Sequence, residues 1–239
     1  MSLIHNIKKG FNKFNIDVVK FPSSDLRRRL KLLNHHQIDL ILDVGANMGQ
    51  YAENLREIGY QGKIVSFEPL SQAYSILVKK TAKDKKWESH NFALGDKEEK
   101  AQINVSKNLF SSSLLDINAE STENAPNSSY HNKEEIIVKK LDDIYEDVTS
   151  NEDIVFLKLD VQGFEKNVLL GAEEILSRVK GIQIEMSLVE LYKNEMLFME
   201  AVNLLKNYGF ELFSLENGFY NDKTGQLLQV DGVFFKTTN

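Results

Sequence analysis

Hydrophobic residues along this 239-residue chain gather in short runs that are separated by longer amphipathic stretches. The clearest runs are strand-sized and lie at 39–44, 63–67, 154–160 and 181–186. Segments 47–58 and 71–80, which follow the first two runs, read as helices that end in glycine or charged turns. Strands that alternate with helices in this way predict an α/β fold with a single doubly wound, mostly parallel sheet.

The remaining elements are less regular. Further strands are predicted at 87–94, 101–105, 136–138, 211–215 and 228–235, with the last two as an antiparallel pair. Further helices are predicted at 24–36, 141–145, 167–178 and 189–208. Segment 118–133 is polar and contains Pro126, so it reads as a loop of unusual length, which is either mobile or functional. We therefore expect a helical extension over 1–38 and one domain over 39–239, with a variable loop or lid at 106–133.

The first twenty residues carry their own apolar pattern. Ile4, Ile7, Phe11 and Phe14 are spaced three to four apart, which predicts an amphipathic helix. We expect its apolar face to pack on this domain or on a second subunit, giving a homo-oligomer, with membrane-surface contact as the alternative. No apolar run is long enough to span a membrane, and no secretory signal is apparent, so a cytoplasmic protein is expected.

The composition and residue spacing of the chain argue against several classes of binding and catalytic site. The net charge of -6 does not favour non-specific nucleic-acid binding. There is no cysteine, which excludes thiol nucleophiles and thiolate zinc sites. The five histidines lack zinc-site spacing, and no Gly-x-Ser-x-Gly elbow occurs. Among the histidines, His131 is a candidate for catalysis or substrate contact, because the long middle loop could fold over a crevice, and a solvated loop residue is the alternative.

The most informative segment runs from Leu40 to Tyr51, where a buried strand leads into a glycine-bearing turn and then a helix. Gly45 and Gly49 flank this turn, and Asn47 stands where a dinucleotide fingerprint has glycine. No basic residue is near enough to meet a pyrophosphate. The turn therefore suits a ligand that has adenosine but no phosphate chain, and a purely structural turn is the alternative.

A carboxylate follows at the tip of the next strand. Glu68 precedes Pro69 and can accept hydrogen bonds from both ribose hydroxyls, although a surface acid is the alternative. Segment 91–94, at the end of the third strand, would border the adenine ring, and an ordinary strand end is the alternative. Together these positions predict a nucleoside site at one edge of the sheet.

A second cluster of polar residues lies near 156–165. Lys158 interrupts an apolar strand and needs an acidic partner, for which Asp160, Glu165 and Glu185 are candidates. Asp160 and Glu185 both end strands at the edge where open α/β sheets bind ligands. Two carboxylates and a lysine could hold a cofactor's amino-acid part, a metal or a substrate hydroxyl, or they could form only a buried charge network.

Taken together, these motifs resemble the FkbM family of S-adenosylmethionine-dependent methyltransferases. The matching segments are 42–49, 67–69, 93–96, 141–143, 157–165 and 184–185, within a resemblance that runs from about Asp39 to Phe235. The resemblance implies a class I methyltransferase fold, with a mainly parallel seven-stranded sheet whose last strand is reversed. Such a fold is Rossmann-like.

The resemblance also assigns roles. It implies that the cofactor's methionine end lies on the turn 43–49, its ribose on Glu68, its adenine near 93–94, and Asp160 near the methionine moiety or the acceptor. The implied cofactor contacts are Asp43, Gly45, Asn47, Gly49, Tyr51, Glu68, Pro69, Ala93, Leu94 and Asp160. The catalytic candidates are Asp160, Glu185, Lys158 and His131. The sequence does not decide whether the reaction needs a divalent metal ion.

Family members mostly methylate hydroxyl groups of polyketides, glycans and related metabolites, so we expect O-methylation of a glycan sugar in polysaccharide biosynthesis. The alternatives are a nicotinamide-dependent oxidoreductase and a nucleoside-binding module without catalysis. A protein or lipid-linked acceptor, attracted by the arginines at 27–29, is a further alternative to a solvated helix face.

Overall fold

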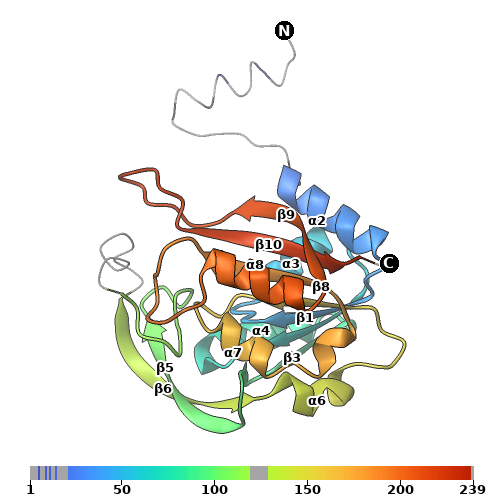
Figure 1. Ribbon diagram of the computed structural model, residues 1–239, viewed down its shortest axis with the longest axis horizontal. Helices are drawn as coiled ribbons and strands as arrows, with labels where there is room; N and C mark the ends of the chain where they lie inside the picture. Colours follow the sequence, from blue (N-terminus) through green and yellow to red (C-terminus); the bar gives the residue numbers. More distant parts are fainter. Residues whose placement is uncertain are drawn as a thin grey trace.

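In the computed structural model of this chain, the described residues are 21–118 and 129–237, together with His5, Lys9, Phe11 and Phe14. Most of the predicted N-terminal amphipathic helix lies outside them, as does Pro126. The described chain forms a large central sheet with helices on both faces and a smaller sheet at one side (Figure 1). This arrangement confirms the predicted α/β class.

The central sheet has seven strands in the order β3-β2-β1-β7-β8-β10-β9. Its parallel strands are β1 (Leu40–Val44), β2 (Lys63–Phe67), β3 (Trp87–His90), β7 (Val155–Leu159) and β8 (Val179–Ser187). The last strand, β10 (Gln229–Lys236), runs antiparallel between β8 and β9 (Phe210–Asn217). The predicted seven-stranded sheet and its reversed last strand are therefore confirmed.

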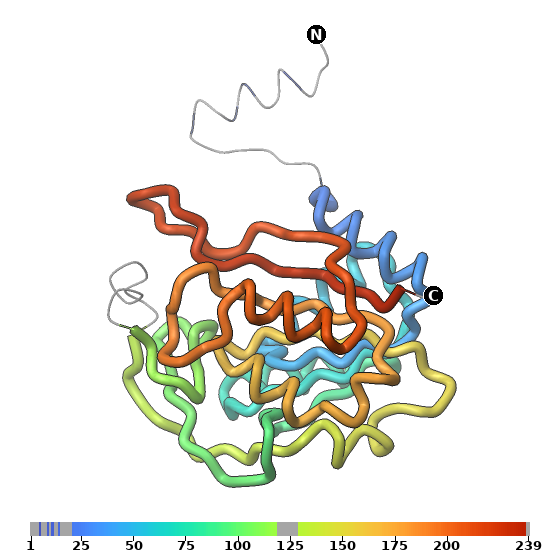
Figure 2. Tube along the Cα trace, viewed as in Figure 1, coloured from blue at the N-terminus to red at the C-terminus, as the bar shows by residue number. Residues whose placement is uncertain are grey.

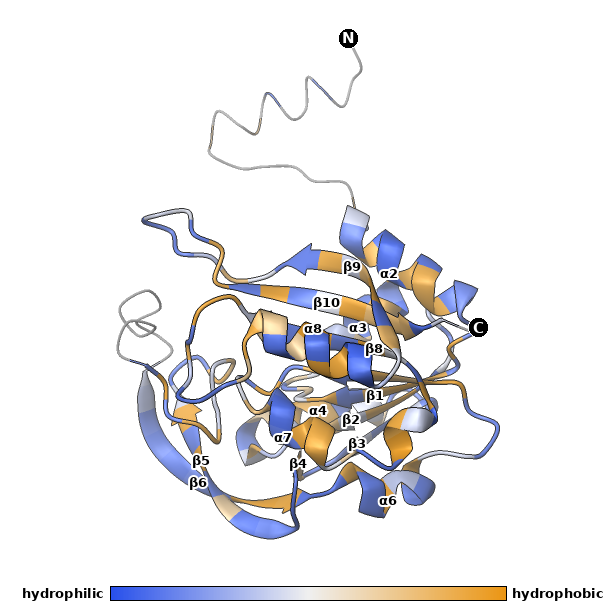
Figure 3. Ribbon diagram, in the orientation of Figure 1, coloured by the Kyte–Doolittle hydropathy of each residue, from blue (hydrophilic) through white to orange (hydrophobic). Residues whose placement is uncertain are grey.

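Two layers of helices bury the two faces of this sheet. One layer has α2 (Ser24–His35), α3 (Gln50–Glu57) and α4 (Ser71–Thr81), and the other has α6 (Leu141–Val148), α7 (Glu165–Leu170) and α8 (Phe198–Asn207). Side chains alternate across a strand, so Ile41 packs with the first layer while Leu40 and Leu42 pack with the second. Figure 3 shows the hydrophobic strands inside and polar residues along the outer helix faces.

A second sheet was not predicted. It contains β4 (Ala93–Leu94), β5 (Glu99–Ser106) and β6 (Tyr130–Lys139), in the order β4-β6-β5. The prediction of one strand over 87–94 is wrong, because Asn91 bonds to the carbonyls of Glu68 and Pro69 and the chain then leaves the central sheet. The predicted loop is also wrong from Tyr130 onward, where the chain pairs with β5.

Two predicted helices are shorter in the structure. Segment 167–178 divides into α7 and a 3-10 helix, Ile175–Ser177, and segment 189–208 is helical only from Phe198. Before α8, the carboxylate of Glu195 accepts the backbone N–H groups of Leu191 and Tyr192, which stabilises a loop. Helix α3 begins at Gln50 and not at 47, because the preceding turn has positive φ at Asn47 and Gly49.

Helix α2 lies beside the carboxyl-terminal strands, as the tube in Figure 2 also shows. The ring of His36 stacks on Phe235 with centroids 3.8 Å apart, and the guanidinium of Arg29 forms a buried ion pair with Glu216. Arg28 bonds to Ser214 on β9. Two of the three consecutive arginines thus connect α2 to the sheet, which weakens the reading of 27–29 as a free basic patch.

Candidate functional site

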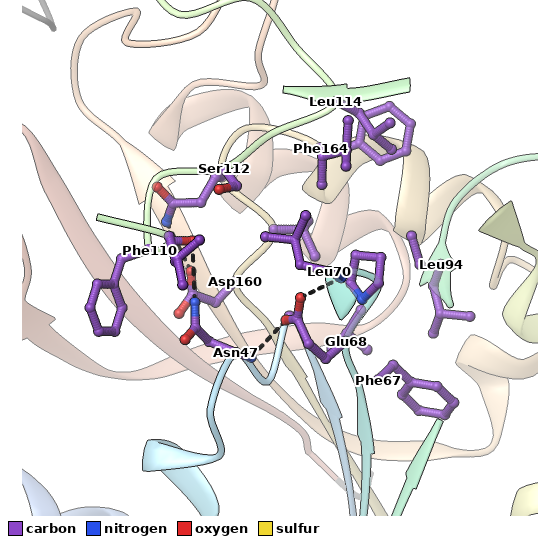
Figure 4. Close-up of a pocket in the computed structure, with 18 of the residues that line it drawn as sticks. Asn47, Phe67, Glu68, Leu70, Leu94, Phe110, Ser112, Leu114, Asp160 and Phe164 are labelled. Atoms are coloured by element: carbon purple, nitrogen blue, oxygen red, sulfur yellow. Dashed lines mark hydrogen bonds between the residues drawn. The ribbon is translucent and has the colours of Figure 1, made fainter. Parts of the chain in front are cut away.

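A cavity of about 290 Å3, here called the edge cavity, lies at the carboxyl ends of β1, β2, β7 and β8 (Figure 4). The chain order reverses between β1 and β7, and open α/β sheets bind ligands at such a switch point. Eight of the predicted site residues line it, namely Gly45, Asn47, Glu68, Pro69, Ala93, Leu94, Asp160 and Glu185. The structure thus brings together the two predicted sites, one formed by residues 45–94 and the other by residues 160–185.

The first wall of the edge cavity is the turn after β1. Gly45 has φ +76°, and its N–H donates to the carbonyl of Phe67. A Cβ at this position would lie 1.8 Å from the backbone oxygen of Asp160. Only glycine allows the β1 turn and the β7 turn to approach this closely, which holds the two halves of the cavity in register.

This close approach gives a stability prediction. We expect Gly45→Ala to lower the free energy of unfolding by about 1–3 kcal/mol more than Gly59→Ala, because overpacking adds to the cost of positive φ. Gly59 is the matched control, since it has φ +100° and nothing within 4 Å of its added Cβ. Urea unfolding of both variants measures the difference, and equal values would contradict the packing role of Gly45.

Glu68 and Asn47 connect the tips of β1 and β2. The two carboxylate oxygens of Glu68 each accept one backbone hydrogen bond, from Asn47 N and Leu70 N, both at 2.8 Å (Figure 4). Each oxygen has two lone pairs, so each keeps one for a ligand hydroxyl in the cavity. Asn47 adopts φ +49°, which Asn tolerates better than most residues, and its amide donates to the carbonyl of Leu109.

The environment of Glu68 changes its acidity. Its side chain is buried, which raises the pKa, while the bonds from Leu70 and Asn47 lower it, and the balance is a pKa of about 7. Burial leaves this carboxylate poorly hydrated. A pair of donors from a ligand would therefore stabilise the charged form, which is the behaviour expected of a ribose-binding acid.

Apolar side chains surround the same end of the cavity. Lining residues on this side include Phe67, Pro69, Leu70, Ala93, Leu94 and Phe164. Apolar walls beside a carboxylate with two available lone pairs fit a purine ring and its ribose. The residues present therefore fit a nucleoside, and an adenine position near Ala93 and Leu94 stays a prediction.

The predicted charge cluster adjoins the edge cavity, with Asp160 among the lining residues and Lys158 outside them. Lys158 Nζ is buried and lies 3.1 Å from an Asp43 oxygen and 3.4 Å from an Asp160 oxygen. Burial lowers the pKa of Lys158, but Asp43 and Asp160 outweigh this, and the pKa is raised. Asp160 was a predicted partner of Lys158, and Asp43 was not. Because Lys158 also donates to the carbonyl of Gly45, the ion pair between Lys158 and Asp43 stabilises the β1 turn.

Two glutamines that the sequence reading did not single out join the acidic groups. Gln162 donates to Asp160 at 3.0 Å and to Glu185 at 2.8 Å, and it accepts from the hydroxyl of Tyr192 at 2.7 Å. Gln229 on β10 also donates to Glu185, at 2.9 Å. Burial, then Asp160 and Asp231, raise the pKa of Glu185 well above its usual value. Gln162 lies in the segment 157–165 that resembles the FkbM family, whereas no sequence pattern indicates Gln229.

Five other candidate residues do not line the edge cavity. Asp43 and Lys158 lie beneath it, and the hydroxyl of Tyr51 bonds to Gln183. Gly49 is a packing position, since its Cβ would lie 2.7 Å from the Trp87 ring. His131 is exposed on β6. These residues are therefore not placed to touch a ligand in the edge cavity, and their predicted roles in catalysis or cofactor contact stay predictions.

Two negative observations concern the described part of the chain. Within residues 21–118 and 129–237, no cluster of three or more His, Asp and Glu side chains is placed to hold a metal ion. None of the helices described there is long and apolar enough to cross a membrane.

Comparison with solved structures returns methyltransferases. A methyltransferase FkbM from Methylobacillus flagellatus KT is 13% identical, with a TM-score of 0.47, over 82% of this chain and 43% of that one. TehB from Haemophilus influenzae is also 13% identical, with a TM-score of 0.47, over 95% of this chain and 65% of that one. A precorrin-6y C5,15-methyltransferase from Geobacter metallireducens GS-15 is 14% identical, with a TM-score of 0.45, over 93% and 94%. This chain thus spans less than two thirds of the first two proteins.

No curated protein matches the chain in sequence. The family model of the methyltransferase FkbM domain, however, matches residues 43–212, which include both walls of the edge cavity. That match covers most of the chain, and it contains the β1 turn, Glu68 and the segment from Asp160 to Glu185. The chain therefore belongs to the FkbM methyltransferase family.

Proposed function

We propose that this chain is an S-adenosylmethionine-dependent O-methyltransferase that methylates a hydroxyl group of a glycan sugar or a related metabolite. The observation that carries the proposal is that one cavity joins the nucleoside-type acid Glu68 to the network of Asp160, Gln162 and Glu185. S-adenosylmethionine, the donor that the family implies, supplies an electrophilic methyl group when bound. Glu68 would hold the ribose, and Asp160 would hold the amino group of the methionine part.

In this proposal the acceptor hydroxyl is the nucleophile and Glu185 is the base. With the donor bound, the acceptor oxygen would bond to the methyl carbon, and the electron pair of the broken carbon–sulfur bond would stay on sulfur. The hydroxyl proton passes to the Glu185 carboxylate, whose raised pKa makes it a better proton acceptor. Gln162 and Gln229 fix the position of that carboxylate, and alignment of the reacting atoms supplies most of the rate.

Lys158 and Asp43 have a supporting role in the proposal. Lys158 neutralises Asp43 and donates to the carbonyl of Gly45, so it stabilises the turn without touching a reactant. His131 receives no role, because it is exposed on β6 and lies away from the cavity residues. Three further points stay predictions. They are a possible requirement for a divalent metal, a homo-oligomer formed through the N-terminal helices, and a cytoplasmic location.

The two rival functions make different demands on the edge cavity. A nicotinamide-dependent oxidoreductase needs cationic or backbone donors for a pyrophosphate. The described residues that line this cavity include no Lys, Arg or His, and the backbone N–H groups of residues 45–49 all donate to groups of the protein itself. A binding module without catalysis would not need the paired glutamine bonds that orient Glu185. Both observations favour methyl transfer.

The test is a transfer assay with methyl-labelled donor against neutral glycosides, polyketide alcohols and small phenols, with and without divalent metal ions. We expect label on the oxygen of a sugar and release of S-adenosylhomocysteine in equal amount. Label found only on nitrogen or on phenols would overturn the sugar assignment. Binding of NADH without binding of the methyl donor would overturn the proposed activity itself.

A further inference from the structure

A second cavity, of about 260 Å3, adjoins the edge cavity and shares Phe110, Gln162 and Glu185 with it. We call it the aromatic chamber and define it by Phe110, Tyr192, Phe219, Gln162, Gln229 and Glu185. Figure 4 shows Phe110 on the side of Asp160 opposite to Glu68, which is the side away from the nucleoside end. Glu185 therefore stands at the boundary between the two spaces.

Three aromatic rings line the aromatic chamber. Phe110 is 53% exposed and Phe219 is 37% exposed, whereas Tyr192 is 3% exposed and fixed by its bond to Gln162. Exposed large apolar side chains beside a cavity mark a surface that a ligand covers. The negative face of an aromatic ring attracts C–H groups, which line the faces of a sugar ring.

The polar groups of the chamber are largely committed to one another. Both donors of Gln162 go to carboxylates, and its oxygen accepts from Tyr192. Gln229 bonds to Glu185. Glu185 lines both cavities and is thus the group that a ligand hydroxyl would meet at the boundary.

Charge at this site disfavours anions. Among the described residues that line the two cavities there is no Lys, Arg or His, while Asp160 and Glu185 contribute acidic groups. A phosphate or carboxylate on the entering ring would lose hydration without gaining a cation. A neutral ring with hydroxyl groups carries no such cost.

We propose that the aromatic chamber binds the methyl acceptor as a neutral sugar ring, packed on Phe110, Tyr192 and Phe219, and that it rejects rings bearing phosphate or carboxylate. This inference rests on the proposed function and specifies the acceptor class. It also makes Phe219, on the segment between β9 and β10, a specificity-determining residue.

The experiment uses the full chain with S-adenosylhomocysteine added, and it measures ring binding by ligand-observed NMR. The probes are methyl glycosides of neutral hexoses and 6-deoxyhexoses, with the matched uronates and 6-phosphates. We expect at least one neutral glycoside to bind about tenfold more tightly than its charged counterparts. We also expect Phe219→Ala to weaken that glycoside about tenfold and Tyr220→Ala to leave it unchanged, since Tyr220 is an exposed neighbour outside the chamber.

Calorimetry with S-adenosylhomocysteine separates the two proposals. If the chain binds S-adenosylhomocysteine but binds no neutral glycoside, or binds uronates and phosphates equally well, the chamber assignment is wrong and the donor site stands. Equal losses in Phe219→Ala and Tyr220→Ala would also overturn it. If S-adenosylhomocysteine itself does not bind, the proposed function fails first. An unchanged S-adenosylhomocysteine affinity in both variants shows that they have folded.

Discussion

Glu185→Gln is expected to reduce the turnover number for methyl transfer by a factor of about 10²–10⁴, which is the usual contribution of a general base. The substitution keeps the shape of the side chain and an oxygen that accepts from Gln162 and Gln229, but it removes the proton acceptor. Donor binding should be unchanged, because Glu185 on β8 is separated from Glu68, at the end of β2, by strands β1 and β7. Steady-state kinetics and calorimetry on the same protein separate the two effects.

The pH profile gives a second readout for Glu185. Burial and the neighbouring carboxylates of Asp160 and Asp231 raise its pKa, so the rate should increase with pH along a limb that lies above the range of an ordinary glutamate. In Glu185→Gln this limb should disappear. Glu211→Gln, an exposed change on β9, is the matched control. A turnover number within about threefold of the unmodified enzyme would remove Glu185 from the catalytic role.

Much of the central sheet could be predicted because its signals are local. Strands 40–44 and 155–159 are apolar apart from one charged residue each, Asp43 and Lys158, and they are buried on both faces by helices, as such runs indicate. The turn from Gly45 to Gly49 and the acid at Glu68 follow from position along these strands. For the same reason, the edge cavity contains most of the predicted cofactor residues.

The second sheet and the chamber depend on contacts that no local pattern records. The first half of β6 carries polar residues on both faces, so it lacks the alternation that identifies a half-buried strand. The apolar spacing in 189–197 favours a helix, but the bonds from Leu191 and Tyr192 to Glu195 stabilise a loop instead. That loop brings Tyr192 to Gln162, and β10 brings Gln229 to Glu185. The two residues of each pair are distant in sequence, so no local sequence pattern predicts the contacts of either glutamine.

Glu68→Ala is expected to weaken binding of S-adenosylmethionine about a hundredfold or more. Two ribose hydroxyls would lose a charged acceptor, and a hydrogen bond to a charged group contributes about 1.5–3 kcal/mol. The backbone N–H groups of Asn47 and Leu70 would also lose their partner, so the free energy of unfolding should fall. Calorimetry measures the affinity, and Glu57→Gln, an exposed change on α3, is the control.

The acidity of Glu68 makes the same affinity depend on pH. Its pKa is about 7 in the free protein, and the ribose hydroxyls bind the ionised form. Binding should therefore be strong above pH 7 and should weaken as the pH falls through 7, by about tenfold between pH 8 and pH 6. Glu68→Gln cannot ionise and should bind weakly at both pH values. If the unmodified protein binds the donor equally well at pH 6 and pH 8, or if Glu68→Gln keeps full affinity, Glu68 does not hold the ribose, because hydroxyl donors at this oxygen pair require the carboxylate.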